Sequence, residues 1–130
     1  MKPRVVITGL GIVSPVGSDI DSAWDNIVNG RSGVGRITRF DPSPFSAQIA
    51  AEVKDFDVTQ YMPAKEAKQM DTFIHYGVAA AVQAWKDSGL EVTEANADRF
   101  GTIIGSGIGG LPRIEEQQID YLERGARRIS

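Results

Sequence analysis

The residues of this chain whose types and spacing most readily suggest chemistry are six consecutive positions, Gly105 to Gly110, that follow a short apolar segment. Gly105, Gly107 and Gly110 satisfy the G-x-G-x-x-G pattern, in which backbone amides at a helix N-terminus hold the pyrophosphate of a dinucleotide. That pattern also needs a second strand ending in an acidic residue about 20 residues further on, where this sequence stops. Two other interpretations stay open: a tight structural turn, and the wall of a narrow substrate pocket.

Other reactive groups are scarce. The chain contains no cysteine, which excludes disulfides, thiolate metal sites and thiol catalysis within this stretch. His75 is the only histidine, so a Ser-His pair or a metal site would need partners that the chain lacks. We therefore expect no catalytic residue, no metal site and no cofactor among these residues.

Two basic clusters stand out in a chain of formal net charge −3. Lys65 and Lys68 are spaced to share one face of a short helix, and Arg124, Arg127 and Arg128 lie near the end of the sequence. The acidic balance argues against nucleic-acid binding, which draws its affinity mainly from Lys and Arg neutralising phosphates. From the residues alone, solvated surface charge explains both clusters.

The elements that must position these residues alternate in type along 130 residues, a length that suits one domain. Short β-branched or alternating runs predict strands, and apolar residues at helical spacing with caps predict helices. The expected strands are 5–8, 47–53 and 100–104, and the expected helices are 19–29 after Ser18, a short one around 65–68, 71–88 and 111–124. This order favours an α/β layered architecture with crossover connections.

Three details of this pattern can be checked against a structure. The segment 31–45 is rich in Gly, Pro and Ser, which predicts a loop. The strand at 47–53 is expected to be half-buried, with its apolar set on the buried face and alternating with Gln48, Ala50 and Glu52: Ala47, Ile49, Ala51 and Val53. The helix 71–88 is apolar on two sides and carries small residues, which is typical of a central helix that other elements approach closely.

The N-terminal apolar run does not have the pattern of a signal peptide. Gly9, Gly11 and Pro15 interrupt it, and nowhere in the chain are there about 20 consecutive apolar residues to span a bilayer. We therefore expect a cytoplasmic protein without a membrane partner.

Several blocks read together resemble the β-ketoacyl-acyl carrier protein synthases, and the long-chain elongating type II enzymes in particular. The first is residues 5–17, VVITGLGIVSPVG, and the others follow in order: GRSGV at 30–34, KE at 65–66, MDTFIHYG at 70–77, DSGL at 87–90, GSGIGGL at 105–111 and GARRIS at 125–130. The resemblance spans the whole chain but only the N-terminal part of the family. It implies a thiolase-like layered α/β fold, a homodimer when complete, and residues 1–130 as an incomplete N-terminal domain.

The reaction implied by the resemblance is a decarboxylative Claisen condensation in fatty acid synthesis. A cysteine at a helix N-terminus accepts an acyl chain from acyl carrier protein, and malonyl-acyl carrier protein then loses carbon dioxide and attacks it. A helix N-terminus stabilises the thiolate, and two histidines with backbone amides stabilise the developing charges. The chain contains no cysteine, and its one histidine, His75, matches neither of the family's two histidines and stands where many members have glutamine. The 130 residues alone are therefore expected to be inactive.

The resemblance also assigns roles outside the chemistry. Gly107 and Ile108 match positions of the acyl pocket, where Ile108 can gate the depth of the pocket. Lys65, Lys68, Arg127 and Arg128 match basic positions that dock the acidic carrier protein. Gln69 and Ala126 depart from the family pattern at this docking surface. Two alternatives remain open: a carrier-protein-binding module without chemistry, and a dinucleotide-binding domain that uses Gly105 to Gly110.

Overall fold

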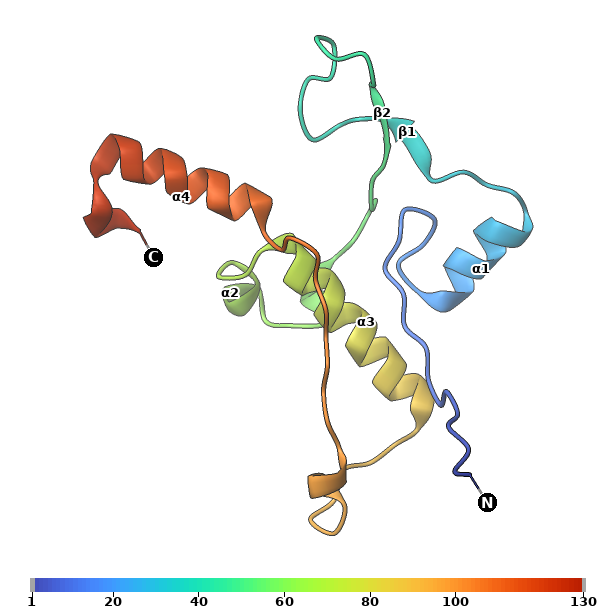
Figure 1. Ribbon diagram of the computed structural model, residues 1–130. Coiled ribbons are helices and arrows are strands. Elements are labelled where there is room, and N and C mark those ends of the chain that lie inside the picture. The colour runs from blue at the N-terminus through green and yellow to red at the C-terminus, as the bar shows by residue number, and fades with distance from the viewer. Residues whose placement is uncertain (1, 130) are drawn as a thin grey trace.

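The computed structural model describes residues 2–129, without the side chain of Arg128, and is organised around one long helix. Figure 1 shows this helix, α3 (Thr72–Ser88), crossing the middle of the molecule with the other elements around it. The helix begins at Asp71, whose carboxylate accepts the backbone N–H of Thr72, and ends at Gly89, which adopts a left-handed conformation with φ of 62°. Both ends are therefore where the sequence predicts them.

The remaining helices also follow the sequence, with small shifts. They are α1 (Ile20–Val28), α2 (Ala64–Ala67) and α4 (Leu111–Arg124), joined by the short 3-10 turns η1 (Val58–Gln60), η2 (Ala97–Arg99) and η3 (Ala126–Arg128). The predicted cap of α1 was wrong by one residue, since Asp19 rather than Ser18 caps it. Only Asp19 places a side-chain oxygen 2.8 Å from the N–H of Ser22, three residues further on.

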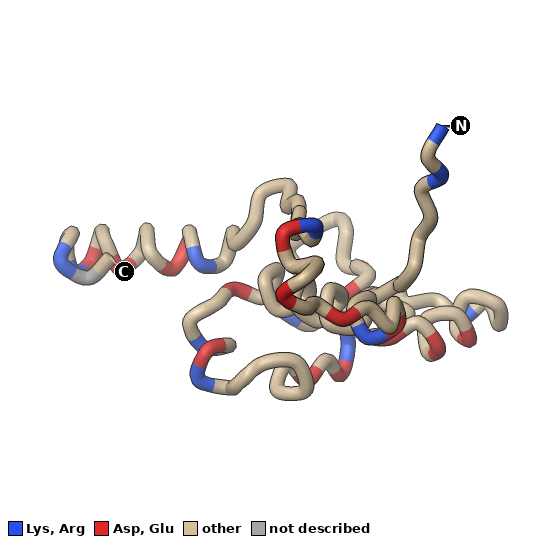
Figure 2. Tube along the Cα trace, turned by 90° about the horizontal axis from the view of Figure 1, so that it is seen from below, with Lys and Arg blue, Asp and Glu red and all other residues tan. Residues whose placement is uncertain are grey.

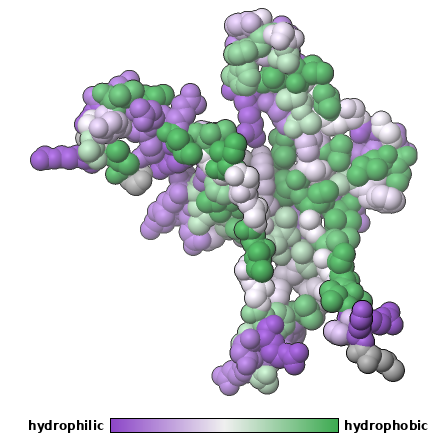
Figure 3. Space-filling view, viewed as in Figure 1, coloured by the Kyte–Doolittle hydropathy of each residue, from purple (hydrophilic) through white to green (hydrophobic). Residues whose placement is uncertain are grey.

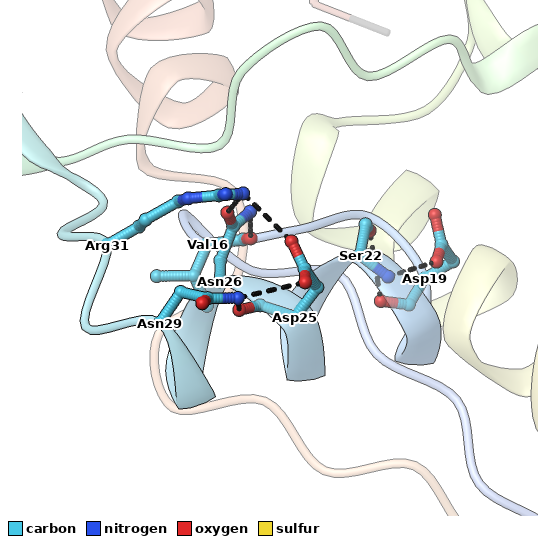
Figure 4. A network of polar contacts seen from close by, with 7 residues as sticks. All are labelled: Val16, Asp19, Ser22, Asp25, Asn26, Asn29 and Arg31. Atoms are coloured by element: carbon cyan, nitrogen blue, oxygen red, sulfur yellow. Dashed lines mark hydrogen bonds and ion pairs between the residues drawn. The ribbon is translucent and has the colours of Figure 1, made fainter.

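A polar network holds α1 against the loops at its two ends (Figure 4). Asn26 donates to the backbone oxygen of Val16, and Arg31 donates to Asp25 and Asn26. The Arg31–Asp25 ion pair is exposed at 2.8 Å, a class that contributes about 0–1 kcal/mol, so the network fixes the loops more than it stabilises the fold.

The capping carboxylate of Asp19 should give α1 a measurable pH dependence. The backbone N–H and hydroxyl of Ser22 lower the pKa of Asp19 below its ordinary 3.8. A lowered folded-state pKa gives stability that is present above 3.8 and lost as pH falls through the folded value. Amide exchange at Ser22 should therefore accelerate in acid beyond the intrinsic trend. Asp19→Asn still caps the helix but cannot titrate, so it should remove this acid-dependent acceleration of exchange at Ser22. An Asp19→Asn protein whose exchange depends on pH as the wild type's does would contradict the role of the Asp19 carboxylate.

The strands differ most from the sequence prediction. The one sheet among the described residues is an antiparallel pair, β1 (Val34–Arg36) and β2 (Ile49–Ala51), with Gly35 opposite Ala50. Placing β1 in a loop was therefore wrong, and so was the inward face of β2, because Ile49 is 67% exposed while Ala50 is half-buried. The Gly-rich segment forms a strand because a neighbouring strand satisfies its backbone groups, which composition does not reveal.

The strands expected at 5–8 and 100–104 were also wrong within the described structure. Both segments are extended but pair with no described strand, and Val5 and Ile103 are 96% and 98% exposed. A β-branched run favours extended backbone, but a strand also needs a neighbour for its hydrogen bonds. The sequence therefore identified the conformation of these segments and not their pairing.

The N-terminal segment at 9–12, which directly follows residues 5–8, and the later segment at 100–104 both lie along α3 and run antiparallel to it. A Cβ at Gly9 or Gly11 would collide with the backbone of α3 around Ala84 and Ala80, so the N-terminal segment lies directly on the helix. On the later segment, Phe100 contacts Trp85 with ring centroids 5.7 Å apart, and Ile104 approaches Gly77. The two segments are therefore parallel to each other, as in a crossover unit, with α3 as the connecting helix.

Apolar side chains remain widely exposed around this arrangement. The buried hydrophobic side chains among the described residues are four small or flexible ones: Ala23, Met62, Ala67 and Ala79. Figure 3 shows hydrophobic surface along the extended segments and over the helices. Apolar patches of this extent are typical of surfaces that another polypeptide covers. No helix within residues 2–129 is long and apolar enough to cross a membrane.

Candidate functional site

The glycine turn lies between the extended segment and α4, against the first turn of α3. Gly109 has a φ of 82°, a left-handed conformation that glycine adopts without strain, and a Cβ there would lie 3.5 Å from the ring of Phe73. Ile108 precedes it and is 74% exposed. The turn therefore presents Ile108 outward, and the described residues do not enclose an acyl pocket around it.

The N-terminus of α4 is already occupied by a carboxylate. One oxygen of Asp71 caps α3 by accepting the N–H of Thr72 at 2.6 Å, and the other accepts the N–H of Arg113 at 3.3 Å. A Cβ at Gly110 would collide with this carboxylate. A pyrophosphate on this glycine turn would need the same amides and would meet negative charge there, which argues against the dinucleotide interpretation.

Of the two lysines of the predicted docking surface, Lys65 lies within α2 and Lys68 is its C-cap residue. Lys65 and Lys68 are both exposed, and neither forms an ion pair with a described residue. The helix beneath them has only four residues, and its anchor is Ala67, which is 6% exposed. The ammonium groups are therefore accessible to a partner from solvent.

The arginines lie on a different element. Figure 2 shows α4 projecting from the rest of the chain, with positive charge at its far end. Arg124 pairs with Asp120 at 3.3 Å, whereas Arg127 lies in η3 beyond the helix and is exposed. The side chain of Arg128 lies outside the described part of the chain. The structure thus separates the two basic clusters onto α2 and the end of α4.

Sequence reasoning missed contacts that fix these elements to one another. His75 of α3 lies with Nε2 2.9 Å from the carbonyl oxygen of Ala67 in α2, and Gln83 and Asp87 accept the N–H groups of Ile12 and Leu10. Asp71 was expected to cap α3, but its contact with Arg113 spans 42 positions of sequence. Polar residues on an otherwise apolar helix were the available signal, but their partners are too distant in sequence to be identified.

The described residues carry no metal-binding constellation. Within residues 2–129 no group of three His, Cys, Asp or Glu side chains is arranged to hold a metal ion, and His75 is engaged with a backbone carbonyl. The candidate features among the described residues are the glycine turn with its exposed isoleucine and the two basic clusters.

Known proteins resemble this chain over nearly its whole length. The family model described as "Beta-ketoacyl synthase, N-terminal domain" matches residues 2–130. The chain belongs to the β-ketoacyl synthase family. Among curated relatives of this family, 3-oxoacyl-[acyl-carrier-protein] synthase 2 of Vibrio harveyi is 52% identical over 99% of the chain, and that of a Synechocystis strain is 48% identical over the same share.

Solved ketosynthases share the fold. The ishigamide ketosynthase/chain length factor aligns with 96% of the chain at a TM-score of 0.71 and 30% identity. A solved complex of a type II PKS acyl-carrier protein with its ketosynthase aligns with 99% of the chain, at a TM-score of 0.74 and 24% identity. The thiolase-like α/β fold of this β-ketoacyl synthase segment is thereby confirmed. The segment spans about a third of its relatives: 31% of both curated sequences and 33% of both solved chains.

Proposed function

We propose that the protein containing this segment elongates fatty acyl chains by decarboxylative condensation of an acyl thioester with malonyl-acyl carrier protein. The observation that carries the proposal is the 52% identity over 99% of the chain to a 3-oxoacyl-[acyl-carrier-protein] synthase 2. The segment lacks cysteine and commits its only histidine to the contact with Ala67. Its residues therefore supply substrate selection and docking, and the nucleophile comes from elsewhere in the protein.

Ile108 is the residue we assign to acyl-chain selection, together with Gly107. The glycine turn lies against Phe73 of α3 and beside the carboxylate of Asp71, which also accepts the N–H of Arg113 in α4. Ile108 projects from this turn with 74% of its surface exposed. A branched apolar side chain held by a fixed turn is suited to line a hydrophobic tunnel once further chain covers it. Gly107 has open space around its Cβ position, so it leaves room for the acyl chain.

Enlarging Ile108 should shorten the acyl chains that the enzyme accepts, which also tests the function itself. For a protein of the relatives' full length, Ile108→Phe should lower kcat/KM for long acyl-carrier proteins by about tenfold or more and spare short ones, because added ring volume fills the tunnel. The measurement is product mass across a series of acyl lengths. Ile108→Leu, which conserves volume, is the control.

Two outcomes of this series would overturn the assignments separately. No elongation of any acyl substrate by the wild-type protein would contradict the proposed function. Elongation with an identical length profile in Ile108→Phe would leave the function standing and remove Ile108 from the pocket.

Acyl carrier protein is the proposed macromolecular partner, and a homodimer is the proposed assembly. Lys65, Lys68 and Arg127 are exposed and have no ion-pair partner within the part of the chain that the structure describes. One of the solved neighbours is a ketosynthase in complex with an acyl-carrier protein. Opposite charge between an acidic carrier and these cations would accelerate their encounter and orient it.

The dinucleotide alternative predicts a different ligand and is easily tested. NAD or NADP should leave the thermal unfolding midpoint of the protein unchanged, because the Asp71 carboxylate occupies the α4 N-terminus that a pyrophosphate would need. The measurement is a thermal scan at increasing cofactor concentration. A concentration-dependent rise in the midpoint would contradict this expectation and restore the glycine turn as a nucleotide site.

A further inference from the structure

The short helix that carries the docking lysines cannot hold its own position. Helix α2 has four residues, and a single turn of helix is unstable in isolation because nucleation fixes several residues for very few hydrogen bonds. Its N-terminal residue is preceded by Pro63, which provides no side-chain cap hydrogen bond. The orientation of Lys65 and Lys68 must therefore be set by contacts from outside α2.

His75 makes such a contact at the C-terminal end of α2. Its Nε2 atom lies 2.9 Å from the carbonyl oxygen of Ala67, and both groups are at least partly shielded from water. A carbonyl oxygen can only accept, so Nε2 carries the proton and donates. The same oxygen also accepts the N–H of Met70 at 3.1 Å, so the imidazole supplies a second hydrogen bond to a carbonyl at the C-terminal end of α2.

This hydrogen bond connects the docking residues to the central helix. Ala67 lies directly before Lys68 and two residues after Lys65, while His75 lies in the first turn of the 17-residue helix α3. Among the described residues it is the side-chain hydrogen bond that joins α2 to α3. Ala67 is 6% exposed, so its carbonyl has little access to water as a substitute partner.

We propose that His75 is a positioning residue for carrier-protein docking: its imidazole fixes α2 on α3 and thereby sets the place and direction of Lys65 and Lys68. The inference rests on the proposed function, since α2 needs a fixed orientation only if its lysines meet a partner. His75 takes no part in the condensation chemistry. Loss of its N–H donor loosens α2 and weakens docking while the reaction centre stays intact.

The test compares variants of a protein of the relatives' full length on two kinds of substrate. His75→Leu should raise KM for acyl carrier protein about three- to tenfold with kcat unchanged, because one partly buried hydrogen bond is lost. Kinetics with an acyl-coenzyme A thioester, which does not need the docking surface, should stay at the wild-type level. Amide exchange at Met70 should accelerate, which reports release of α2 directly.

His75→Gln is the conservative variant. Its amide N–H can donate to the Ala67 carbonyl, so it should restore both KM and the slow exchange at Met70. His75→Asn, one carbon shorter than Gln, should behave as the Leu variant does, and it replaces Leu if that variant fails to fold.

The outcomes distinguish this inference from the proposed function. If the wild-type protein elongates acyl chains and neither His75→Leu nor His75→Asn raises KM for the carrier protein, the positioning role is wrong. An equal loss with carrier-protein and coenzyme A substrates would also overturn it, since that result reports general damage to the fold. If the wild-type protein elongates no thioester at all, the proposed function itself fails.

Discussion

Reversing the charge of both docking lysines, Lys65→Glu with Lys68→Glu, should raise KM for acyl carrier protein by about 10- to 100-fold and leave kcat nearly unchanged. Both side chains are exposed and unpaired among the described residues, so replacing them perturbs no ion pair of the fold. Opposed charges accelerate encounter with an acidic partner, and like charges across an interface cost several kcal/mol. Initial rates at varied carrier-protein concentration measure the effect.

A matched control separates local docking from overall charge. Arg36 and Lys54 lie in β1 and just after β2, are exposed, and form no ion pair with any residue of the described chain. Arg36→Glu with Lys54→Glu changes net charge by the same amount but should leave KM close to wild type. The effect of Lys65→Glu with Lys68→Glu should also diminish at high salt, where charges are screened. Equal effects of the two double variants would contradict a docking surface on α2.

Gly11→Ala should prevent stable folding or lower the thermal unfolding midpoint severely. A Cβ at this position would collide with the carbonyl of Ala80 and approach the backbone N of Ala84, and a backbone cannot rotate away as a side chain can. Overpacking of this kind costs about 1–3 kcal/mol and sometimes more. Thermal unfolding of the protein measures the loss directly.

The control for this substitution is Gly35→Ala in β1. Its Cβ would meet only the end of the Lys54 side chain at 3.9 Å, an ordinary contact, so stability should stay within about 0.5 kcal/mol of wild type. A Gly11→Ala protein as stable as the Gly35→Ala control would show that the N-terminal segment does not lie on α3 as described.

The helices could be predicted from sequence because their signals are local. Asp71, Gly89 and Pro112 are each within one turn of the backbone groups that they cap or terminate, and the structure confirms all three helix boundaries that they mark. The small residues of α3 likewise predicted close approach, and Gly9 and Gly11 lie against Ala84 and Ala80. Signals that lie within the helix itself can be read without knowing which other element packs against it.

The strands were predicted less accurately than the helices, because the pairing of strands depends on residues distant in sequence. The runs at 5–8 and 100–104 have β-branched composition, but their backbone groups need a neighbour that the described residues do not provide. Conversely, Gly35 sits in a Gly-rich segment and forms a strand because Ala50 lies opposite it. The predicted buried face of β2 was wrong for the same reason, because the packing partner decides which face of a strand is buried.

Recognition of the site depended on the family resemblance more than on spacing. Lys65, Lys68 and Ile108 have no feature in the sequence alone that separates them from ordinary surface residues. The contacts that position them, from His75 to Ala67 and from Asp71 to Arg113, join residues 8 and 42 positions apart and became visible only in three dimensions. Their assignment to docking and to the acyl pocket stays a prediction until the variants above are measured.

Product mass from a side-by-side condensation assay tests the central claim most directly. The 130-residue chain and a protein of the relatives' full length would each be given acyl- and malonyl-acyl carrier protein. We predict that the longer protein forms a 3-oxoacyl product extended by two carbons and that the 130-residue chain forms none, because it contains no cysteine to accept the acyl group. Failure of the longer protein to extend any acyl chain, or extension by the 130 residues alone, would contradict the account.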